Sequence, residues 1–372
     1  MKQQIILMAV YNKIQCDARV IRAATALNKA GFVVRVISCN SDPNFTDQNF
    51  ESIIYSSAKR GFPLFWRFCY FVFTFALREH KKVDLLYMHD YQLVFVGRII
   101  AFFTGRKWIY DAHELLLQRK KHCCSKREKF FQFLERISIS SADLVIAANT
   151  ERERIIRRIF RLKNTVSVAN IAPIFVPDFK VLDKKDILLY QGVLSEERDL
   201  TGYISALKKM PPHVMLKVIG GGPRLEYYRN LVENDELLKG RIIFTGQIPY
   251  VQLVQESQEC KIGIISYLLD DLNNYYCSPN KLFEYIQMGI PVLVSPQPFL
   301  KKVVRKYRIG AVLPPSFSEQ ELVKSVLDIL EHYNSFRAGM NTFLADYSHE
   351  REMAKLRNAV KELVVPNEKD CQ

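Results

Sequence analysis

One short segment of this 372-residue chain combines residue types that could bind a phosphorylated ligand. Ser278 and Pro279 predict the start of a helix, because serine caps helices and proline fits the first turn. The N-terminus of a helix offers free N–H groups to an anion, and Lys281 would be poorly placed there unless an anion bound. Glu284 would follow one turn later on the same face, where its carboxylate could accept hydrogen bonds from a ribose diol. The alternative is a capped helix that carries a solvated Lys281–Glu284 pair.

The sequence of this segment resembles a known signature. From residue 276 it reads YCSPNKLFEY, and MGIPVLV follows at 288–294. This pattern resembles the donor-binding segment of retaining glycosyltransferases of the GT-B fold, in the family-4 group (glycosyl transferases group 1). More narrowly, it resembles a subgroup whose motif reads PNK-LFEY. The resemblance implies that the diphosphate of a nucleotide sugar is held by Ser278, Pro279, Asn280 and Lys281, and that the ribose is held by Glu284.

The segment departs from the family pattern at one position. The family often has a second glutamate eight positions before the ribose glutamate, and this chain has Tyr276 there. The departure leaves open which residue positions the transferred sugar. Asn274 and Tyr275 are the neighbouring alternatives.

Two loops after predicted strands add to the resemblance. The loop 192–198 (GVLSEER) is similar to the family's first loop of the C-terminal domain, where a basic residue contacts the diphosphate. Arg198 matches that residue, and the alternative is a surface arginine. The turn 220–223 (GGGP) is similar to the family's GxGP turn, whose glycines permit close backbone approach. The resemblance therefore adds to the donor site Gly192, Gly221, Gly222, and the nucleobase-side residues Pro249 and Tyr250.

Polar residues also follow the predicted strands of the N-terminal half. His113 lies in the run YDAHE and matches a family histidine that lines the acceptor and the transferred sugar. A neutral imidazole can hydrogen-bond a sugar hydroxyl. The alternatives are a structural histidine at this position and a loop-orienting role for His89 and Asp90. The candidate acceptor-side residues are Asp17, Arg19, His89, Asp90, Asp111 and Glu114.

The elements that must position these residues alternate along the chain. Short apolar runs separated by helical patterns predict an α/β protein with parallel sheets covered on both faces. A proline-containing break at 170–186 predicts a linker. We expect two Rossmann-like domains, 1–172 for the acceptor and 173–345 for the nucleotide sugar, whose strands aim their carboxyl ends into a central cleft. The remaining residues, 346–372, predict a helix that packs back toward the N-terminal domain. The expected strands are 5–10, 33–38, 85–88, 108–110, 144–147, 166–168, 187–190, 214–219, 242–244, 262–266 and 292–295.

The composition limits the partners. A net charge of +14 and a pI of about 9.3 favour a polyanionic partner. No nucleic-acid-binding signature is present, so we expect no nucleic-acid partner. The eight cysteines form no CxxC pair and are expected to be reduced thiols. Asp270 and Asp271 do not form a DxD motif, so no metal and no cofactor are expected.

One aromatic segment suggests a membrane contact. Residues 62–77 read FPLFWRFCYFVFTFAL, and Arg119–His122 form a second basic cluster. Aromatic residues beside cations suit a helix that lies in an anionic membrane interface. The alternative is a buried helix of the first domain. The segment is too short and too interrupted to span a membrane, so we expect a cytoplasmic protein that can bind peripherally at the inner face of the plasma membrane.

The resemblance implies a reaction. We expect a metal-independent transfer of a sugar from a nucleoside-diphosphate sugar, with UDP favoured, to a hydroxyl of a lipid-linked or polysaccharide-precursor glycan, with retention. Arg198, Lys281 and the helix N-terminus would stabilise the leaving diphosphate. The alternatives are a sugar-nucleotide epimerase of similar fold and a non-catalytic subunit that has kept the fold.

Overall fold

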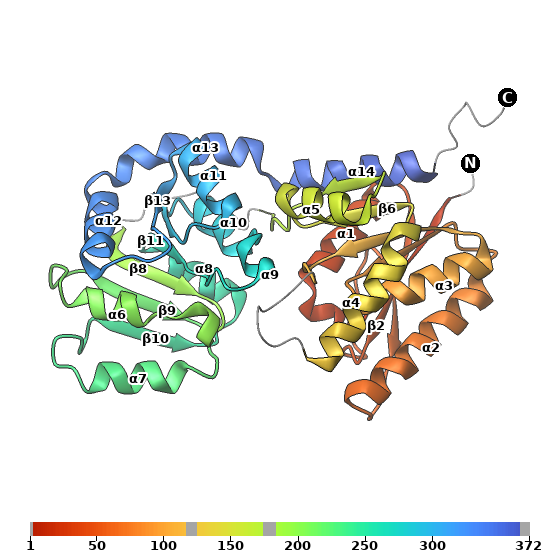
Figure 1. Cartoon of the computed structure of the whole chain (residues 1–372), viewed down its shortest axis with the longest axis horizontal. Coiled ribbons are helices and arrows are strands. Elements are labelled where there is room, and N and C mark those ends of the chain that lie inside the picture. Colours follow the sequence, from red (N-terminus) through yellow and green to blue (C-terminus); the bar gives the residue numbers. More distant parts are fainter. Residues whose placement is uncertain (1–2, 117–124, 174–183, 365–372) are drawn as a thin grey trace. The chain divides into compact units, whose positions relative to one another are not determined.

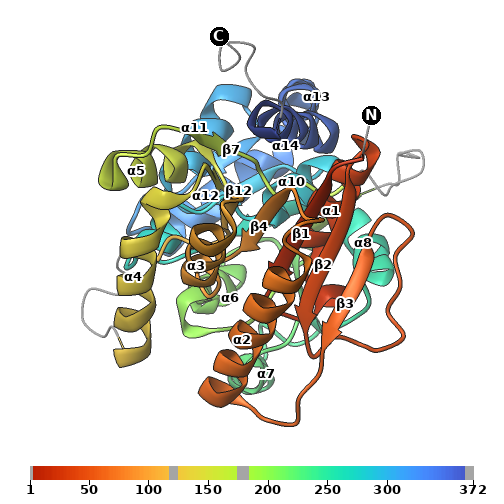
Figure 2. The same ribbon diagram turned by 90° about the vertical axis from the view of Figure 1, so that its right-hand side faces the viewer.

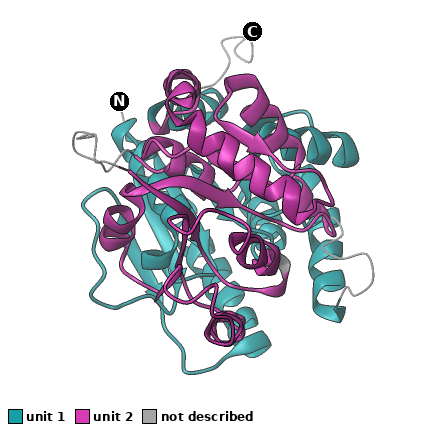
Figure 3. Ribbon diagram, turned by 90° about the vertical axis from the view of Figure 1, so that its left-hand side faces the viewer, with its two compact units in different colours: residues 1–170, 350–372 teal, residues 171–349 magenta. Residues whose placement is uncertain are grey.

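The structure, a computed structural model, describes residues 3–116, 125–173 and 184–364. It divides into two compact units (Figures 1 and 3). Unit 1 comprises residues 1–170 and 350–372, and unit 2 comprises residues 171–349. The basic cluster predicted at Arg119–His122 and part of the predicted linker lie outside the described residues.

Each unit is built on a parallel sheet. In the described part of unit 1 the strand order is β3-β2-β1-β4-β5-β6-β7, and every pairing is parallel. The expected strands of this half are present, and the edge strand β3 was not predicted from the sequence. The strands are β1 Ile5–Val10, β2 Val33–Cys39, β3 Glu51–Tyr55, β4 Leu85–His89, β5 Lys107–Ala112, β6 Leu144–Ala147 and β7 Thr165–Ser167.

Unit 2 repeats this plan. Its described strands have the order β10-β9-β8-β11-β12-β13 and are also all parallel. The edge strand β13 was not predicted. The strands are β8 Lys185–Gln191, β9 Met215–Ile219, β10 Ile242–Gly246, β11 Cys260–Ile265, β12 Val292–Val294 and β13 Gly310–Val312. The helices are α6 Thr201–Leu207, α7 Leu225–Glu233, α8 Tyr250–Gln258, α9 Leu272–Tyr275, α10 Asn280–Gln287, α11 Pro298–Tyr307, α12 Glu319–Glu331 and α13 Phe336–Asp346.

The helices of unit 1 cover both faces of its sheet. One face packs against α3, where a Cβ on Gly97 would lie 2.7 Å from the side chain of Met88 and 2.8 Å from that of Trp108. Tyr87 alternates with Met88 and points into the core on the other face, with α1 and α14. The helices are α1 Ala18–Lys29, α2 Gly61–Glu79, α3 Val94–Thr104, α4 Lys126–Ser138, α5 Thr150–Phe160 and α14 His349–Val364.

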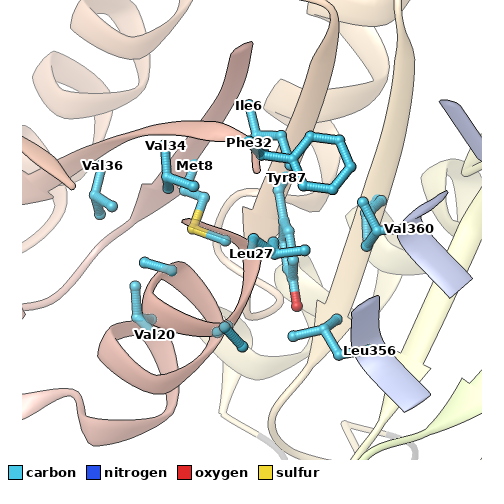
Figure 4. Close-up of a cluster of buried hydrophobic side chains, with 14 of the residues drawn as sticks. Ile6, Met8, Val20, Leu27, Phe32, Val34, Val36, Tyr87, Leu356 and Val360 are labelled. Carbon is cyan, nitrogen blue, oxygen red and sulfur yellow. The ribbon is translucent and has the colours of Figure 1, made fainter. Parts of the chain in front are cut away.

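The C-terminal helix α14 belongs to the core of unit 1. Met353, Leu356 and Val360 are buried in the cluster that contains Ile6, Met8 and Tyr87. Figure 4 shows Leu356 and Val360 beside Leu27 and Tyr87. The backbone N–H of Ala169, at the end of the first pass through unit 1, donates to the buried Glu352 carboxylate at 2.7 Å. The chain therefore returns to its first unit after completing the second.

The aromatic segment at 62–77 forms most of α2, which is buried on one side and exposed on the other. Leu64, Phe65, Phe68 and Val72 are buried in unit 1. Aromatic residues on the same helix, Trp66 and Tyr70 among them, are exposed. In the described parts of the chain, no helix combines the length and apolarity needed to cross a bilayer.

Removing the Leu356 side chain is expected to destabilise unit 1. Leu356→Ala leaves a cavity in a packed core and should lower the free energy of unfolding by about 2–5 kcal/mol. Lys361→Ala, on an exposed position of the same helix, should change it by less than about 0.5 kcal/mol. Urea unfolding followed by tryptophan fluorescence measures this directly, because Trp66 and Trp108, the two tryptophans, both lie in unit 1. Equal midpoints for the two variants would contradict the placement of α14.

Candidate functional site

The loops that follow β8 and β9 pack backbone against backbone. Gly192, after β8, has φ 129°, and Gly220, after β9, has φ 141°. A Cβ on Gly220 would lie 2.0 Å from the carbonyl oxygen of Gly192, and one on Gly222 would lie 2.4 Å from that of Leu194. Only glycine fits these two positions. Gly221 has open space around it, so the close approach expected of the GGGP turn belongs to Gly220 and Gly222, and Gly221 is not part of it.

Two cations converge on the first of these loops. A Cβ on Gly192 would lie 3.7 Å from Nζ of Lys281 and 3.8 Å from Nη1 of Arg198. The Lys281 ammonium lies 4.4 Å from the ring centre of Tyr190 and 5.4 Å from that of Tyr267. The Arg198 guanidinium lies 5.2 Å from the same Tyr267 ring. The predicted pair of cationic residues is therefore brought together, and the aromatic rings around it were not predicted.

The ammonium of Lys281 is buried without a hydrogen-bond partner among the described residues. The residue is only 7% exposed, although it is the second residue of α10. Burial, together with the nearby charge of Arg198, lowers the pKa of Lys281 to about 7. Buried charged groups are normally paired, so this arrangement has the chemistry needed to bind an anion.

The start of α10 corrects one prediction. Its N-cap is Pro279, which makes no side-chain capping bond, and Ser278 lies one residue outside the helix. Pro279 has extended dihedral angles (φ −69°, ψ 139°), so the chain enters the helical conformation only at Asn280. The expected serine cap is therefore wrong: the N-cap residue has no side-chain acceptor for the first-turn N–H groups, and its carbonyl accepts from the N–H of Leu282, at 3.0 Å.

Glu284 lies beside a residue that sequence reasoning missed. The side-chain amide of Gln191, the last residue of β8, donates to the Glu284 carboxylate. The backbone N–H of Gln191 donates to the Tyr285 hydroxyl at 3.0 Å, which fixes this strand end against α10. Oε1 of Gln191 is buried and has no hydrogen-bond partner in the described regions. Its position directly before Gly192, at the carboxyl end of a strand, is the signal that could have identified it.

The remaining predicted donor residues adjoin these loops. The Gly220 N–H donates to the Gly246 carbonyl at 2.9 Å, which connects the glycine turn to the end of β10. Pro249 is the N-cap of α8, and Tyr250, which is 45% exposed, begins that helix. Among the alternatives to the missing family glutamate, the Asn274 amide is held by Asp271 at 3.0 Å. Tyr275 and Tyr276 contact each other edge to face.

Two predicted acceptor-side residues of unit 1 form a buried ion pair. Arg19 donates from Nε and Nη2 to the Asp111 carboxylate at 2.7–3.2 Å, and from Nη1 to the Val168 carbonyl at 3.0 Å. The Tyr87 hydroxyl also donates to Asp111, at 3.0 Å. Burial alone would raise the pKa of Asp111, but the Arg19 guanidinium and the nearby histidines hold it well below its usual range. These two residues therefore tie α1 to β5, and their charges are already satisfied.

Two other acceptor-side candidates, Asp17 and Asp90, have local structural roles. The Asp17 carboxylate caps α1 by accepting from the Val20 N–H at 3.2 Å. Asp90 has a positive φ of 63°, and its carboxylate accepts from the N–H of Tyr91 at 2.9 Å. Glu114 is half-buried in the loop after β5. Asp90 is thus the strained residue at the end of β4, directly after His89.

His113 stands at the edge of a compact polar cluster. Nε2 of His113 lies 3.2 Å from Nδ1 of His89, and these atoms lie 3.8 Å and 3.5 Å from Oδ2 of Asp111. His89 is fully buried and stacks on Tyr87, whereas the His113 side chain is 16% exposed. Of the cluster, His113 is therefore the residue that a ligand can reach.

Three ligand atoms this close together could hold a metal ion. Nε2 of His89, however, is buried without a hydrogen-bond partner among the described residues. A metal on Nδ1 would force a proton onto Nε2 and leave an orphan N–H, which is rarer than an orphan acceptor. The charge of Arg19 also opposes a cation beside Asp111. The cluster fits a neutral hydrogen-bonded network better, with Nδ1–H of His89 donating to His113, which then carries its own proton on Nδ1.

The comparisons with known proteins agree with this architecture. Residues 17–170 match the family model described as glycosyl transferase 4-like domain, and residues 175–342 match that of glycosyl transferases group 1. The uncharacterized glycosyltransferase YqgM of Bacillus subtilis (strain 168) is 25% identical over 173 residues, 45% of this chain. That match spans about half (48%) of the relative's length.

Solved structures resemble the whole chain. Sucrose-phosphate synthase from Thermosynechococcus elongatus has a TM-score of 0.77 at 18% identity, over 97% of this chain and 99% of that one. HepE of Anabaena, in complex with UDP, has a TM-score of 0.73 at 16% identity, over 97% and 100%. At these identities the likeness shows the fold alone. It confirms the predicted pair of Rossmann-like domains with parallel sheets, as in GT-B structures.

Acidification is expected to destabilise unit 1 through His113. Burial, with Arg19 and His89, lowers the pKa of His113 from 6.5 to about 4, against the opposing charge of Asp111. The unfolded chain therefore binds more protons than the folded one between pH 6.5 and 4, and stability falls as the pH falls through this window. His113→Gln should flatten the dependence, measured as urea midpoints at pH 7, 6 and 5.

Comparing wild type with His113→Gln separates the effect of His113 from an opposite effect of Glu135 on the pH dependence of stability. Burial raises the pKa of Glu135 to about 7, although the Tyr110 hydroxyl opposes the shift, so its contribution to stability is present at low pH and lost as the pH rises toward 7. The contribution of Glu135 is the same in wild type and in His113→Gln, so it cancels when the stability of one is subtracted from that of the other. Parallel pH profiles for wild type and His113→Gln would contradict the burial of a neutral His113.

Proposed function

Because this chain is a glycosyltransferase of the GT-B type, we propose that it moves a sugar from a nucleoside-diphosphate sugar to a hydroxyl of a lipid-linked or polysaccharide-precursor glycan. UDP is the favoured nucleotide, and the anomeric configuration is retained. The resemblance of the segment 276–294 supports retention, and structures of HepE with UDP and UDP-glucose support UDP. The observation that carries the proposal is the buried ammonium of Lys281, which has no hydrogen-bond partner among the residues that the structure describes.

That ammonium suits a diphosphate for electrostatic reasons. Lys281 lies beside Arg198, so each cation raises the free energy of the other until an anion binds between them. Gly192 places a backbone without a side chain next to both charged groups. A diphosphate here would accept hydrogen bonds from both cations and from the first-turn N–H groups of α10.

Glu284 and Gln191 support the assignment of the ribose. A ribose offers two vicinal hydroxyls, and the Glu284 carboxylate can accept from both. The Gln191 amide orients that carboxylate, and its unpaired Oε1 could accept from the ligand. A nucleotide held at both ends, by cations at the diphosphate and by a carboxylate at the sugar, has one orientation in the site.

The proposed chemistry uses the same cations. As the glycosidic bond of the donor breaks, negative charge accumulates on the departing diphosphate. A bound anion would raise the pKa of Lys281 and keep it protonated beside the Arg198 guanidinium. These side chains would supply the charge stabilisation for which other enzymes use a divalent ion, so the proposed transfer needs no metal and no cofactor.

On the acceptor side we propose a role for His113. Its side chain is partly exposed, and its lowered pKa gives a neutral imidazole at pH 7. In the tautomer favoured by the cluster it would donate from Nδ1 to a sugar oxygen. Asp111 and His89 would position this ring through the hydrogen-bonded network. A lipid-linked acceptor would be reached by peripheral contact with an anionic membrane, at the inner face of the plasma membrane.

Removing either donor-site charge is expected to abolish turnover. Lys281→Ala and Glu284→Ala should each lower kcat/KM by at least about 100-fold, because each removes a contact to the donor. Both variants should remain folded, and Lys281→Ala should be at least as stable as the wild type, because it removes a buried, unpaired charge. The substrate for the assay comes from a thermal-shift screen of UDP-, GDP- and ADP-sugars.

The matched control is Lys324→Ala, an exposed lysine of α12 outside the site. It should leave turnover unchanged. Full activity in both site variants would overturn the donor-site assignment. Incubating the enzyme with donor alone distinguishes the rival reaction, since formation of an epimeric nucleotide sugar without acceptor would identify an epimerase.

Donor affinity is expected to weaken above pH 7. Lys281 must be protonated to attract the diphosphate, and its pKa in the free protein is about 7. Above that pH each binding event must take up a proton, so Kd should rise by up to about tenfold per pH unit between pH 7.5 and 9. Calorimetry in buffers of different ionisation enthalpy measures both the affinity and the proton uptake.

A nucleotide sugar is the suitable probe, because its doubly esterified diphosphate does not titrate in this range. Lys281→Met should bind weakly and without pH dependence. A wild-type affinity that stays constant from pH 7 to 9, with no proton uptake, would show that Lys281 does not contact the donor.

A further inference from the structure

The outer side of α2, α3 and α4 carries a concentration of exposed apolar side chains. Seven of the 17 large hydrophobic side chains that are exposed in the described parts of the chain lie on these three helices. They include the two most exposed, Phe102 at 81% and Tyr70 at 71%. Contiguous exposed apolar surface on a folded protein marks an interaction site. The seven are Phe62, Trp66, Tyr70, Phe102, Phe103, Phe133 and Ile137, which we call the aromatic face.

Ring contacts join the three helices into one surface. Phe62, Trp66 and Tyr70 are spaced four residues apart and therefore follow one stripe of α2. The rings of Phe62 and Trp66 lie 5.8 and 6.1 Å from that of Phe130 on α4. Phe73 of α2 lies 6.0 Å from Phe103 of α3. Figure 2 shows α2, α3 and α4 side by side, as their packing contacts require.

The charges around the aromatic face have one sign. In the described residues of α2, α3 and α4, every charged residue that is exposed is a cation. The acidic residues of these helices interact with other groups of the chain. Glu79 forms an ion pair with Arg35, Glu128 belongs to the capping box of α4, and Glu135 accepts a hydrogen bond from the Tyr110 hydroxyl. The exposed cations are Arg67, Arg78, Arg98, Lys126, Arg127, Lys129 and Arg136.

We propose that the aromatic face docks on the surface of an anionic lipid bilayer. Aromatic and aliphatic side chains flanked by Lys and Arg are what an interfacial surface needs, because the apolar groups enter the headgroup boundary while the cations meet lipid phosphates. The absence of a helix able to span a bilayer, among those described, fits a surface contact. This inference deepens the proposed function, since a lipid-linked acceptor would lie in the same membrane, but it shares no residue with the donor site.

The chain provides its own spectroscopic reporter. Of its two tryptophans, Trp108 is buried at 1% exposure and Trp66 is 44% exposed within the aromatic face. Adding vesicles of phosphatidylglycerol and phosphatidylcholine should shift the tryptophan emission to the blue, and brominated lipid should quench it. Trp66→Phe should lose both signals while still co-sedimenting with the vesicles. Vesicles of phosphatidylcholine alone should bind at least tenfold more weakly.

Two triple variants test the apolar and the charged parts of the face. Tyr70→Ser, Phe102→Ser and Phe103→Ser together should lower vesicle partitioning at least tenfold. Their control combines Tyr227→Ser, Leu237→Ser and Leu327→Ser, which are exposed apolar positions of unit 2.

The charged part of the face is tested in the same way. Arg67→Gln, Lys126→Gln and Lys129→Gln together should also lower vesicle partitioning at least tenfold at low salt. Their control combines Lys301→Gln, Arg305→Gln and Lys324→Gln, which removes the same net charge from unit 2. Both controls should partition like the wild type.

Several results would overturn the proposal. These are no blue shift with anionic vesicles, equal partitioning to neutral vesicles, or losses in the control triples that match those in the face variants. Concentration-dependent dimerisation that the aromatic triple abolishes, without vesicle binding, would assign the face to a second copy. Binding of a single-stranded oligonucleotide in place of vesicles would assign it to nucleic acid. The variant with Tyr70→Ser, Phe102→Ser and Phe103→Ser should still bind a nucleotide sugar. A failure of the membrane proposal can thereby be told from a failure of the donor-site assignment.

Discussion

A buried ammonium with no hydrogen-bond partner in the described part of the chain is the constraint on which the second unit depends. Lys281 lies against two tyrosine rings, next to a second cation, and the difference between its usual pKa of 10.5 and about 7 corresponds to about 5 kcal/mol of lost preference for the charged form. That amount is comparable to the whole stability of many domains. An anion bound beside such a group would gain a strong, water-excluded attraction.

The two units use their polar strand ends differently. In unit 2 the loops after β8 and β9 approach so closely that two glycines are required, and this contact brings Gly192 beside the cations. In unit 1 the corresponding polar residues satisfy one another, since Arg19, Asp111, Tyr87 and the two histidines form one network. Among the described residues, unit 2 therefore holds a buried cation without a hydrogen-bond partner, whereas unit 1 holds a neutral, partly exposed imidazole of His113 within a hydrogen-bonded network.

The spacing of residues along the sequence predicted much of the candidate site and of the fold. The features that it missed depend on contacts between residues far apart in the sequence. Lys281 and Glu284 could be identified because three residues along a helix share a face, whereas Tyr190, Gln191 and Tyr267 come from other strands and loops. The serine cap was wrong because Pro279 itself is extended. Arg19 and Asp111 are 92 positions apart, so the sequence could not show that they neutralise each other. The edge strands β3 and β13 were not predicted because their sequences contain too few consecutive apolar residues to indicate a buried strand.

A crystal structure of the chain with a UDP-sugar or UDP tests the central claim most directly. The account predicts that both phosphates lie at the N-terminus of α10, with oxygens within hydrogen-bond distance of Nζ of Lys281 and of the Arg198 guanidinium. The Glu284 carboxylate should accept from the ribose hydroxyls. A nucleotide whose phosphates lie elsewhere, with Lys281 still unpaired beside Tyr190, would contradict it.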